Sequence, residues 1–147
     1  MSGAFGPVAD YVPHRPPMLM IEEIVDVTAE RAICRTTIRP DCVFAIEGQV
    51  HPSAMIEFVG QACAIWAGVT SAREGKPPRT GFIVSCREVA FTVNSFAVGD
   101  ELTIVATKIL GEHQLAAFDG TVTRDDQICV TIQLSVVDAE LAGGPSS

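Results

Sequence analysis

The sequence predicts an α+β fold in which an antiparallel sheet wraps around one long central helix. The helix is indicated by an apolar segment, residues 52–73, that contains no proline after its first position. Two strand-like segments precede it, and four β-branched runs separated by short turns follow it, which favours antiparallel meanders. Because 147 residues are the length of one domain, we assign residues 1–140 to a single domain and expect the tail, residues 141–147, to be disordered.

Two strands are expected ahead of the helix. The first covers residues 18–27 ("MLMIEEIVDV"), which follow an irregular, proline-rich start and are rich in Met, Leu, Ile and Val. The second covers residues 32–38, and the letters "TAER" indicate the turn that joins the two strands.

The long apolar segment has the features of a helix that lies inside a sheet. Ser53 is expected to cap its first turn, and "EGKPP" stops it after Arg73. A helix of about twenty residues is roughly 30 Å long and a ten-residue strand about 33 Å, so strands can follow the helix along its length. Its apolar positions run almost all round, and small residues allow close approach of a sheet: Gly60, Ala62, Ala64, Ala67 and Gly68.

Four strands are expected after the helix. Turn signals such as "VGD", "GE" and "RDD" separate them, and apolar and polar residues alternate in "TIVATKI" and "VTIQLSVV". The four segments are residues 80–93, 100–110, 113–124 and 127–139.

Composition and charge exclude several kinds of partner. The formal net charge is −8 and no basic cluster is present, which disfavours nucleic-acid binding. The most apolar window, residues 55–70, is too short for a bilayer span and contains Glu57 and Gln61, so we expect no membrane segment. The five cysteines are odd in number, widely spaced and not preceded by a signal peptide, which favours a reducing cytoplasm over a disulfide framework.

Motifs of several enzyme classes are missing from the sequence. Neither a CxxC nor an HxxxH pair occurs, so no metal is expected. Cys63 has no histidine near it in sequence and is interpreted as a small buried hydrophobe. A GxSxG elbow, a P-loop and a dinucleotide fingerprint are also absent.

The residues that point to chemistry are Glu57 and Gln61, which share one helix face because they are four positions apart. One interpretation is that Glu57 points into water in the first helical turn, where the helix dipole favours it. The other is that its apolar neighbours hold it close to the core. Burial would then keep the carboxyl protonated near neutral pH, so that it can give a proton to a leaving group.

Two of the three histidines are candidates for a catalytic base. His51 stands just before the first helical turn, where the backbone N–H groups of Ser53 and Ala54 could hold an oxyanion. His14, in "VPHRPP", could be brought near by the fold. His51 is the first choice and His14 the second; for each, a structural or surface role is the alternative. His113 lies in a predicted turn and is assigned no role.

Three motifs stand out together: "VPHRPPMLMIEEIVDV", "MIEFVGQACAIWAG" and "FIVSCREVAFTVNSFAVGDEL". With the order of the elements, they resemble the hot-dog fold 3-hydroxyacyl-(acyl-carrier-protein) dehydratases over most of the chain. The first is similar to that family's opening Leu-Pro-His-Arg. The second is similar to its central helix, so that Glu57 falls on the catalytic acid and Gln61 on the accompanying glutamine. The third is similar to the post-helix strand and its Pro-Gly-Asp turn, here Val98, Gly99 and Asp100.

One motif of the family is missing. Its Gly-His-Phe-Pro-Gly loop supplies a histidine ahead of the glutamate, but this chain has "DCVFAIEGQVHP", in which the corresponding position is Val43. The sequence therefore resembles the shorter, divergent branch of dehydratases of aryl-polyene-type gene sets, through its "PHRPPML" and "IE…Q" signatures.

The resemblance implies an activity. A base removes the proton next to the carbonyl of a 3-hydroxyacyl thioester, backbone N–H groups hold the enolate oxygen, and Glu57 protonates the departing hydroxyl, which leaves a trans-2-enoyl thioester. Gln61, Ser53 and Ala54 are the implied substrate-binding residues. The acyl chain would arrive on the phosphopantetheine arm of an acyl carrier protein, at a site shared within a homodimer or a heterodimer, without a metal or redox cofactor.

Two other functions remain open at this point. A hot-dog thioesterase would use a carboxylate on the same helix to activate water. A non-catalytic accessory subunit would keep the fold and complete a site for a paralogous dehydratase, which the missing histidine loop favours.

Overall fold

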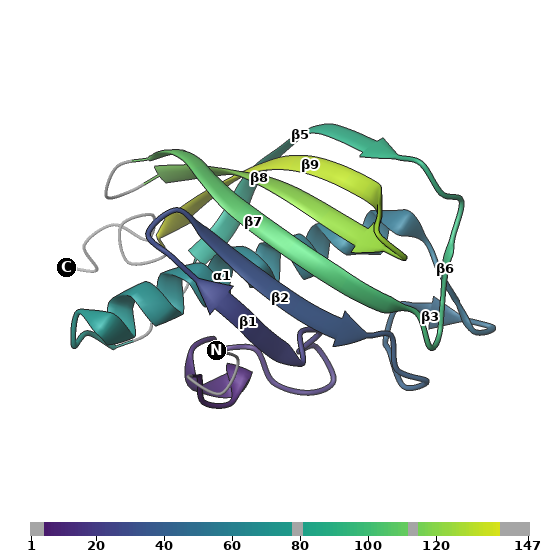
Figure 1. The fold of residues 1–147 in the computed structure, drawn as a ribbon, viewed down its shortest axis with the longest axis horizontal. Coiled ribbons are helices and arrows are strands. Elements are labelled where there is room, and N and C mark those ends of the chain that lie inside the picture. The colour runs from purple at the N-terminus through teal and green to yellow at the C-terminus, as the bar shows by residue number, and fades with distance from the viewer. Residues whose placement is uncertain (1–4, 78–80, 112–114, 139–147) are drawn as a thin grey trace.

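The structure, a computed structural model, describes residues 5–77, 81–111 and 115–138. A six-stranded antiparallel sheet, in the spatial order β1-β2-β7-β8-β9-β5, curves around the long helix α1 (Figure 1). The expected fold class is confirmed. The helix covers Met55–Arg73, and the strands are β1 (Glu23–Val27), β2 (Arg31–Thr37), β5 (Gly81–Phe91), β7 (Glu101–Gly111), β8 (Leu115–Arg124) and β9 (Gln127–Asp138).

Five of the six predicted strands lie where the sequence places them. The strand before the helix at residues 32–38 is β2, and the four runs after the helix are β5, β7, β8 and β9. The predicted turn "VGD" is present as well: Gly99 has a φ of 96°, and Asp100 Oδ2 accepts a hydrogen bond of 2.8 Å from the amide of Ala97. The expected tail, residues 141–147, and His113 lie outside the described residues.

The first predicted strand is partly wrong. Only its second half is β1, which begins at Glu23. Met20 and Ile21, just before it, are buried, but the backbone of Met20 is bonded to side chains: Met20 N donates to Gln61 Oε1 at 2.8 Å, and Thr36 Oγ1 donates to Met20 O at 2.7 Å. An apolar run predicts burial, and burial alone does not specify a strand.

A small three-stranded sheet was not predicted. It consists of β3 (Ala45–Ile46), β4 (Gln49–Val50) and β6 (Phe96–Ala97), in the order β3-β4-β6. Two-residue strands are too short to produce a visible alternation of apolar and polar residues, which explains why the sequence did not indicate them.

The start of the helix differs from the prediction. A 3-10 turn, η3 (Pro52–Ala54), precedes α1, and the cap is His51, whose Nδ1 accepts from the amide of Ser53 at 3.1 Å. Ser53 is therefore not the cap; its hydroxyl lies 2.8 Å from the same ring nitrogen. Ala54, the residue directly before α1, makes no side-chain cap.

Helix α1 is the centre of the core. Its buried side chains include Phe58, Val59, Ile65 and Val69, which face a sheet interior that contains the fully buried Phe118. The stretch 52–73 is long and apolar enough to span a membrane by length and hydropathy, yet half of its apolar stretch is buried inside the protein, as expected for a core helix.

The sheet has two edges of different length, the short strand β1 and the long strand β5. Its outermost strands are β1 and β5, and each pairs with a sheet neighbour on one side. Strand β5 exposes apolar side chains along its length, with Ile83, Val84, Val89 and Phe91 between 37% and 56% exposed. An edge strand with such a surface is a template for pairing with another chain.

Candidate functional site

A histidine and a glutamate meet on one face of α1. His14 Nε2 lies 3.8 Å from Glu57 Oε2, and the two side chains are 28% and 32% exposed. Glu57 belongs to the first turn of the helix, whereas His14 comes from the segment ahead of β1. Glu57 is therefore less buried in the single chain than the acid that the sequence predicts.

Gln61 is the residue that joins this pair to the rest of the fold. Its Nε2 donates to Glu57 Oε2 and to the carbonyl oxygen of Met18, both at 2.7 Å, and its Oε1 accepts from Met20 N at 2.8 Å. Gln61 is only 1% exposed. Its amide is held in one orientation, because a flip would place the amide group against the N–H of Met20 and the carbonyl oxygen against two acceptors.

His14 is carried by residues 5–20, which we call the N-terminal strap (purple in Figure 1). Within the strap, Arg15 Nη1 donates to the carbonyl oxygens of Val12 at 2.8 Å and His14 at 2.7 Å. The amides of Met18 and Leu19 donate to the carbonyl oxygen of Arg15. These bonds satisfy the turn locally, so the backbone around His14 is a compact unit.

The strap lies along α1 from one end to the other. Arg73 stands over the Phe5 ring, 5.8 Å from its centroid, near the helix C-terminus. In the C-terminal half of the helix, Gly68 leaves the space that the Tyr11 backbone fills, since a Cβ at Gly68 would overlap the Tyr11 carbonyl oxygen. The sequence analysis expected the small Gly68 to admit the sheet; it admits the strap.

His51 takes a structural place in the described contacts. Its Nδ1 is bonded to Ser53, and its ring meets Phe91 edge-on with the centroids 6.2 Å apart. The structure thus brings the second-choice histidine, His14, to Glu57, and places His51 against β5.

The two amides predicted to hold an oxyanion are both engaged within the chain. Ser53 N donates to His51 Nδ1, and Ala54 N donates to the carbonyl oxygen of His51 at 3.0 Å. A substrate carbonyl at these amides would have to replace those bonds, so the role of Ser53 and Ala54 stays a prediction.

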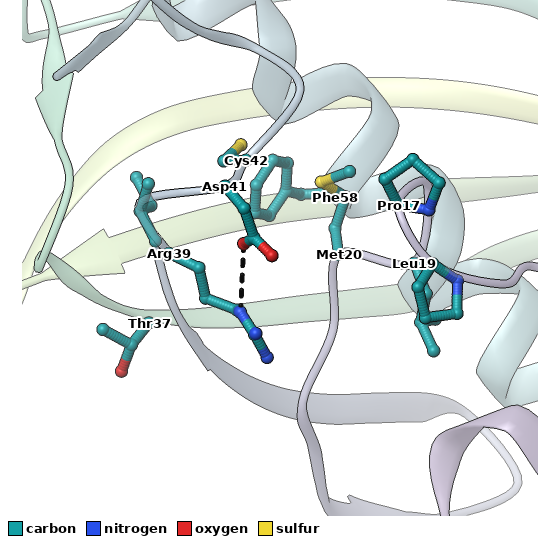
Figure 2. A pocket seen from close by; sticks show the side chains of 10 residues that line it. Pro17, Leu19, Met20, Thr37, Arg39, Asp41, Cys42 and Phe58 are labelled. Carbon is teal, nitrogen blue, oxygen red and sulfur yellow. Dashed lines mark hydrogen bonds and ion pairs between the residues drawn. The ribbon is translucent and has the colours of Figure 1, made fainter.

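A pocket of about 130 Å³ lies between the strap, residues 37–42 and Phe58 of α1 (Figure 2). Its walls are mainly apolar, with Pro17 and Leu19 from the strap and Phe58 from α1. They also include Arg39 and Asp41, whose Nε and Oδ1 form an ion pair at 3.2 Å. It contains neither His14 nor Glu57. The pocket therefore borders the site through Phe58, the neighbour of Glu57, without including the pair.

Two of the cysteines, Cys34 and Cys63, lie in the core. Burial raises the pKa of the Cys63 thiol, and that of Cys34 to about 12, so both stay protonated near neutral pH. Among the described residues, no group of three or more His, Cys, Asp or Glu is placed to hold a metal ion.

Sequence reasoning missed the strap as an element of the site. The signals were present, because "PHRPP" combines a histidine with three prolines and Gly68 leaves an apolar helix without a side chain at that position. What the sequence did not contain is the pairing of Gln61 with the backbone of Met18 and Met20, which depends on long-range geometry.

An antiparallel sheet curved around one helix, with an acid on the helix and a histidine brought to it, defines a protein of the hot-dog fold class. Within that class, a family model described as ApeP dehydratase matches residues 6–143, and the chain belongs to this ApeP-like family. The resemblance to hot-dog dehydratases, and to their aryl-polyene-type branch, is thereby confirmed, and the role of the chain is of the dehydratase type.

Solved structures agree on the fold. The dehydratase heterocomplex ApeI:P from Xenorhabdus doucetiae contains a chain with a TM-score of 0.89 and 24% identity, over 97% of this chain and 99% of that one. A hypothetical thioesterase with coenzyme A from Streptococcus pneumoniae has a TM-score of 0.62 and 11% identity, over 79% and 86% of the two chains. Zebra fish thioesterase superfamily member 2 has a TM-score of 0.60 and 13% identity, over 79% of each.

No curated protein matches the chain in sequence.

Proposed function

We propose that this protein removes water from a 3-hydroxyacyl thioester carried on the phosphopantetheine arm of an acyl carrier protein, and so forms a trans-2-enoyl thioester. The observation that carries the proposal is the distance of 3.8 Å between His14 Nε2 on the strap and Glu57 Oε2 on the first turn of α1. Membership of the ApeP-like dehydratase family supports the reaction type.

In the proposed reaction, His14 is the base and Glu57 the acid. The neutral imidazole takes the proton from the carbon next to the thioester carbonyl, and the protonated carboxyl gives its proton to the hydroxyl, which leaves as water. The electrons of the broken C–H bond form the new C=C bond. The reaction leaves His14 as imidazolium and Glu57 as carboxylate. Transfer of one proton from His14 to Glu57 restores the starting states, and the two atoms are only 3.8 Å apart.

The hydrogen bonds of Glu57 suit this role. Gln61 donates to Oε2, which orients the carboxyl group and leaves Oε1 without a described hydrogen bond. Oε1 is then the oxygen that would face the departing hydroxyl. The reaction needs no metal or redox cofactor, because a proton is removed and a proton is supplied by side chains of the chain itself.

Turnover of a 3-hydroxyacyl carrier protein, followed by mass spectrometry as the loss of one water, tests the proposal. We expect His14→Ala and Glu57→Gln each to lower the rate by about 10²–10⁴-fold, the usual contribution of a positioned acid or base. His51→Ala is the matched control, because it removes the histidine that caps η3 and leaves the one beside Glu57 in place. It should keep most of the rate. Wild-type turnover in His14→Ala would contradict the assignment of the base.

Thioester hydrolysis is the second candidate, and the exposure of Glu57 favours it. About a third of this side chain is open to solvent, so water can reach the carboxylate. Hydrolysis liberates a free thiol and dehydration does not, so a thiol reagent in the same assay separates the two reactions.

For the partner, we propose a second hot-dog chain that pairs with the edge of β5, either a copy of this chain or a paralogous subunit. The exposed apolar residues of β5 support this surface, and the solved ApeI:P assembly is described as a heterocomplex. Turnover only after mixing with a paralogous hot-dog chain would identify this protein as an accessory subunit. We place the reaction in the cytoplasm, as the cysteine content predicts.

A further inference from the structure

The position of His14 relative to Glu57 depends on how the N-terminal strap is held on α1. The two residues belong to different elements, and the His14 ring has no described hydrogen bond of its own: Nδ1 is buried without a partner, and Nε2 faces Glu57 at 3.8 Å. The ring is therefore placed by its backbone, and the backbone by whatever fastens the strap.

Gln61 fastens the strap at the site. It bonds the carbonyl oxygen of Met18 and the amide of Met20 on the strap, and it bonds Glu57 on its own helix. Both amide hydrogens are used in these bonds, and the residue is 1% exposed. Gln61 consequently has no donor left for a substrate, in contrast to the substrate-binding role that the family resemblance implies for it.

The strap transmits this attachment to His14. The turn that contains His14 is closed by Arg15, whose Nη1 bonds the carbonyl oxygens of Val12 and His14, while its own carbonyl oxygen accepts from Met18. Met18 is thus bonded to the His14 turn on one side and to Gln61 on the other. A displacement at Met18 would move the histidine.

We propose that Gln61 is a positioning residue that clamps the strap to α1 and sets the separation of His14 and Glu57. The assignment of chemical roles to that pair rests on the proposed function, but the clamp itself is a statement about geometry. Gln61→Met tests it, because methionine has a similar length and removes all three hydrogen bonds. Gln133→Met is the matched control: the same change on β9, where the amide donates to Asp119 at 3.4 Å.

Two measurements report on the clamp without any turnover. The first is hydrogen exchange at the Met20 amide, which should become roughly tenfold faster in Gln61→Met, since its acceptor is lost. The second is the change in the NMR signals of the His14 ring caused by Glu57→Gln. This change should be clear in the wild-type background and largely lost in the Gln61→Met background. Gln133→Met should alter neither result.

Turnover then separates positioning from substrate binding. A clamp predicts a lower kcat with KM little changed, whereas a substrate-binding glutamine predicts a raised KM. Should Gln61→Met not fold, Gln61→Glu keeps an acceptor for Met20 and loses the donors to Met18 and Glu57, and it should show the same loss of response in the His14 ring.

Unchanged Met20 exchange, or a His14 ring that still responds fully to Glu57→Gln, would overturn the clamp whatever the enzyme does. Failure of the proposed function looks different: His14→Ala would then keep wild-type turnover, while exchange and ring signals would still respond to Gln61→Met.

Discussion

At the scale of single residues, burial decides which side chains are available for chemistry. Cys34 is completely buried and Cys63 is 3% exposed. Desolvation is the main reason why the pKa of each thiol is raised, and for Cys63 the proximity of Cys34 adds to it. Both thiols lie in the core and stay neutral at physiological pH; for Cys63, burial is what the sequence predicted.

The same burial predicts a loss of stability at alkaline pH. Between pH 9.0, the ordinary pKa of a thiol, and about 12, the folded pKa of Cys34, only the unfolded chain releases this proton. The free energy of unfolding should therefore fall by about 1.4 kcal/mol per pH unit for this thiol as pH rises through that window, and be unaffected below it. Urea denaturation of wild-type protein and Cys34→Ala from pH 7 to pH 10.5 measures it. Equal slopes above pH 9 in both proteins would contradict the prediction.

At the scale of elements, the site is a joint between a helix and a strap. Helix α1 presents Glu57 and Gln61 on one face, and the strap supplies His14. The strap is held at Gln61 by hydrogen bonds and at Gly68 by close packing against Tyr11. Because these attachments are separate, the strap can be disturbed at a point distant from the acid.

Gly68→Ala should disturb the strap at that point. The added Cβ would overlap the Tyr11 carbonyl oxygen, which is backbone and cannot turn away, so a loss of about 1–3 kcal/mol in unfolding free energy is expected, with slower turnover. Gly60→Ala is the control on the same helix, because its Cβ would meet the flexible tip of Ile83 at 2.8 Å. Denaturation and turnover of both variants check the prediction. At an open helix position, alanine would stabilise the protein through its higher helix propensity. A stabilised Gly68→Ala protein would therefore refute the prediction.

At the scale of the whole molecule, the sheet has one edge suited to a partner. Strand β5 carries exposed Ile83 and Val84, and Ile83 also packs against α1 near Gly60. A chain that paired with β5 would cover these residues and would approach the helix face that presents Glu57. His51, against Phe91 of β5, lies at the same surface.

Val84→Lys should weaken this association. Val84 is 56% exposed, so a lysine costs the folded chain little, but it would place a charge in an apolar interface between chains. For the dimer proposed through this edge, we expect a shift to monomer in light scattering after gel filtration, with the melting temperature of the monomer little changed. Leu110→Lys, at a more exposed leucine on the central strand β7, is the control. An unchanged dimer in Val84→Lys would exclude the edge of β5 as the interface.

The parts of the fold that follow from local patterns were predictable. Apolar and polar residues alternate in parts of β7 and β9, β-branched runs between turn signals mark β5 and β8, and the helix is one long apolar segment. The small sheet of β3, β4 and β6 and the strap were not predictable, because two-residue strands and irregular backbone leave no periodic signal. The first predicted strand was too long for the same reason: residues 18–20 belong to the irregular strap, and their backbone is bonded to Gln61 and Arg15 and not to the backbone of a neighbouring strand.

By itself the sequence determined the fold class, the helix that carries Glu57 and Gln61, and the two histidines that could join them, because residue order and periodicity are local properties. Only the tertiary structure decided that His14 lies beside Glu57 while His51 caps η3 and packs on Phe91. The physical reason is that the strap finds its place through hydrogen bonds to a glutamine some forty residues away and through the space above one glycine. Such contacts are fixed by the folded chain as a whole and have no counterpart in any short stretch of the sequence.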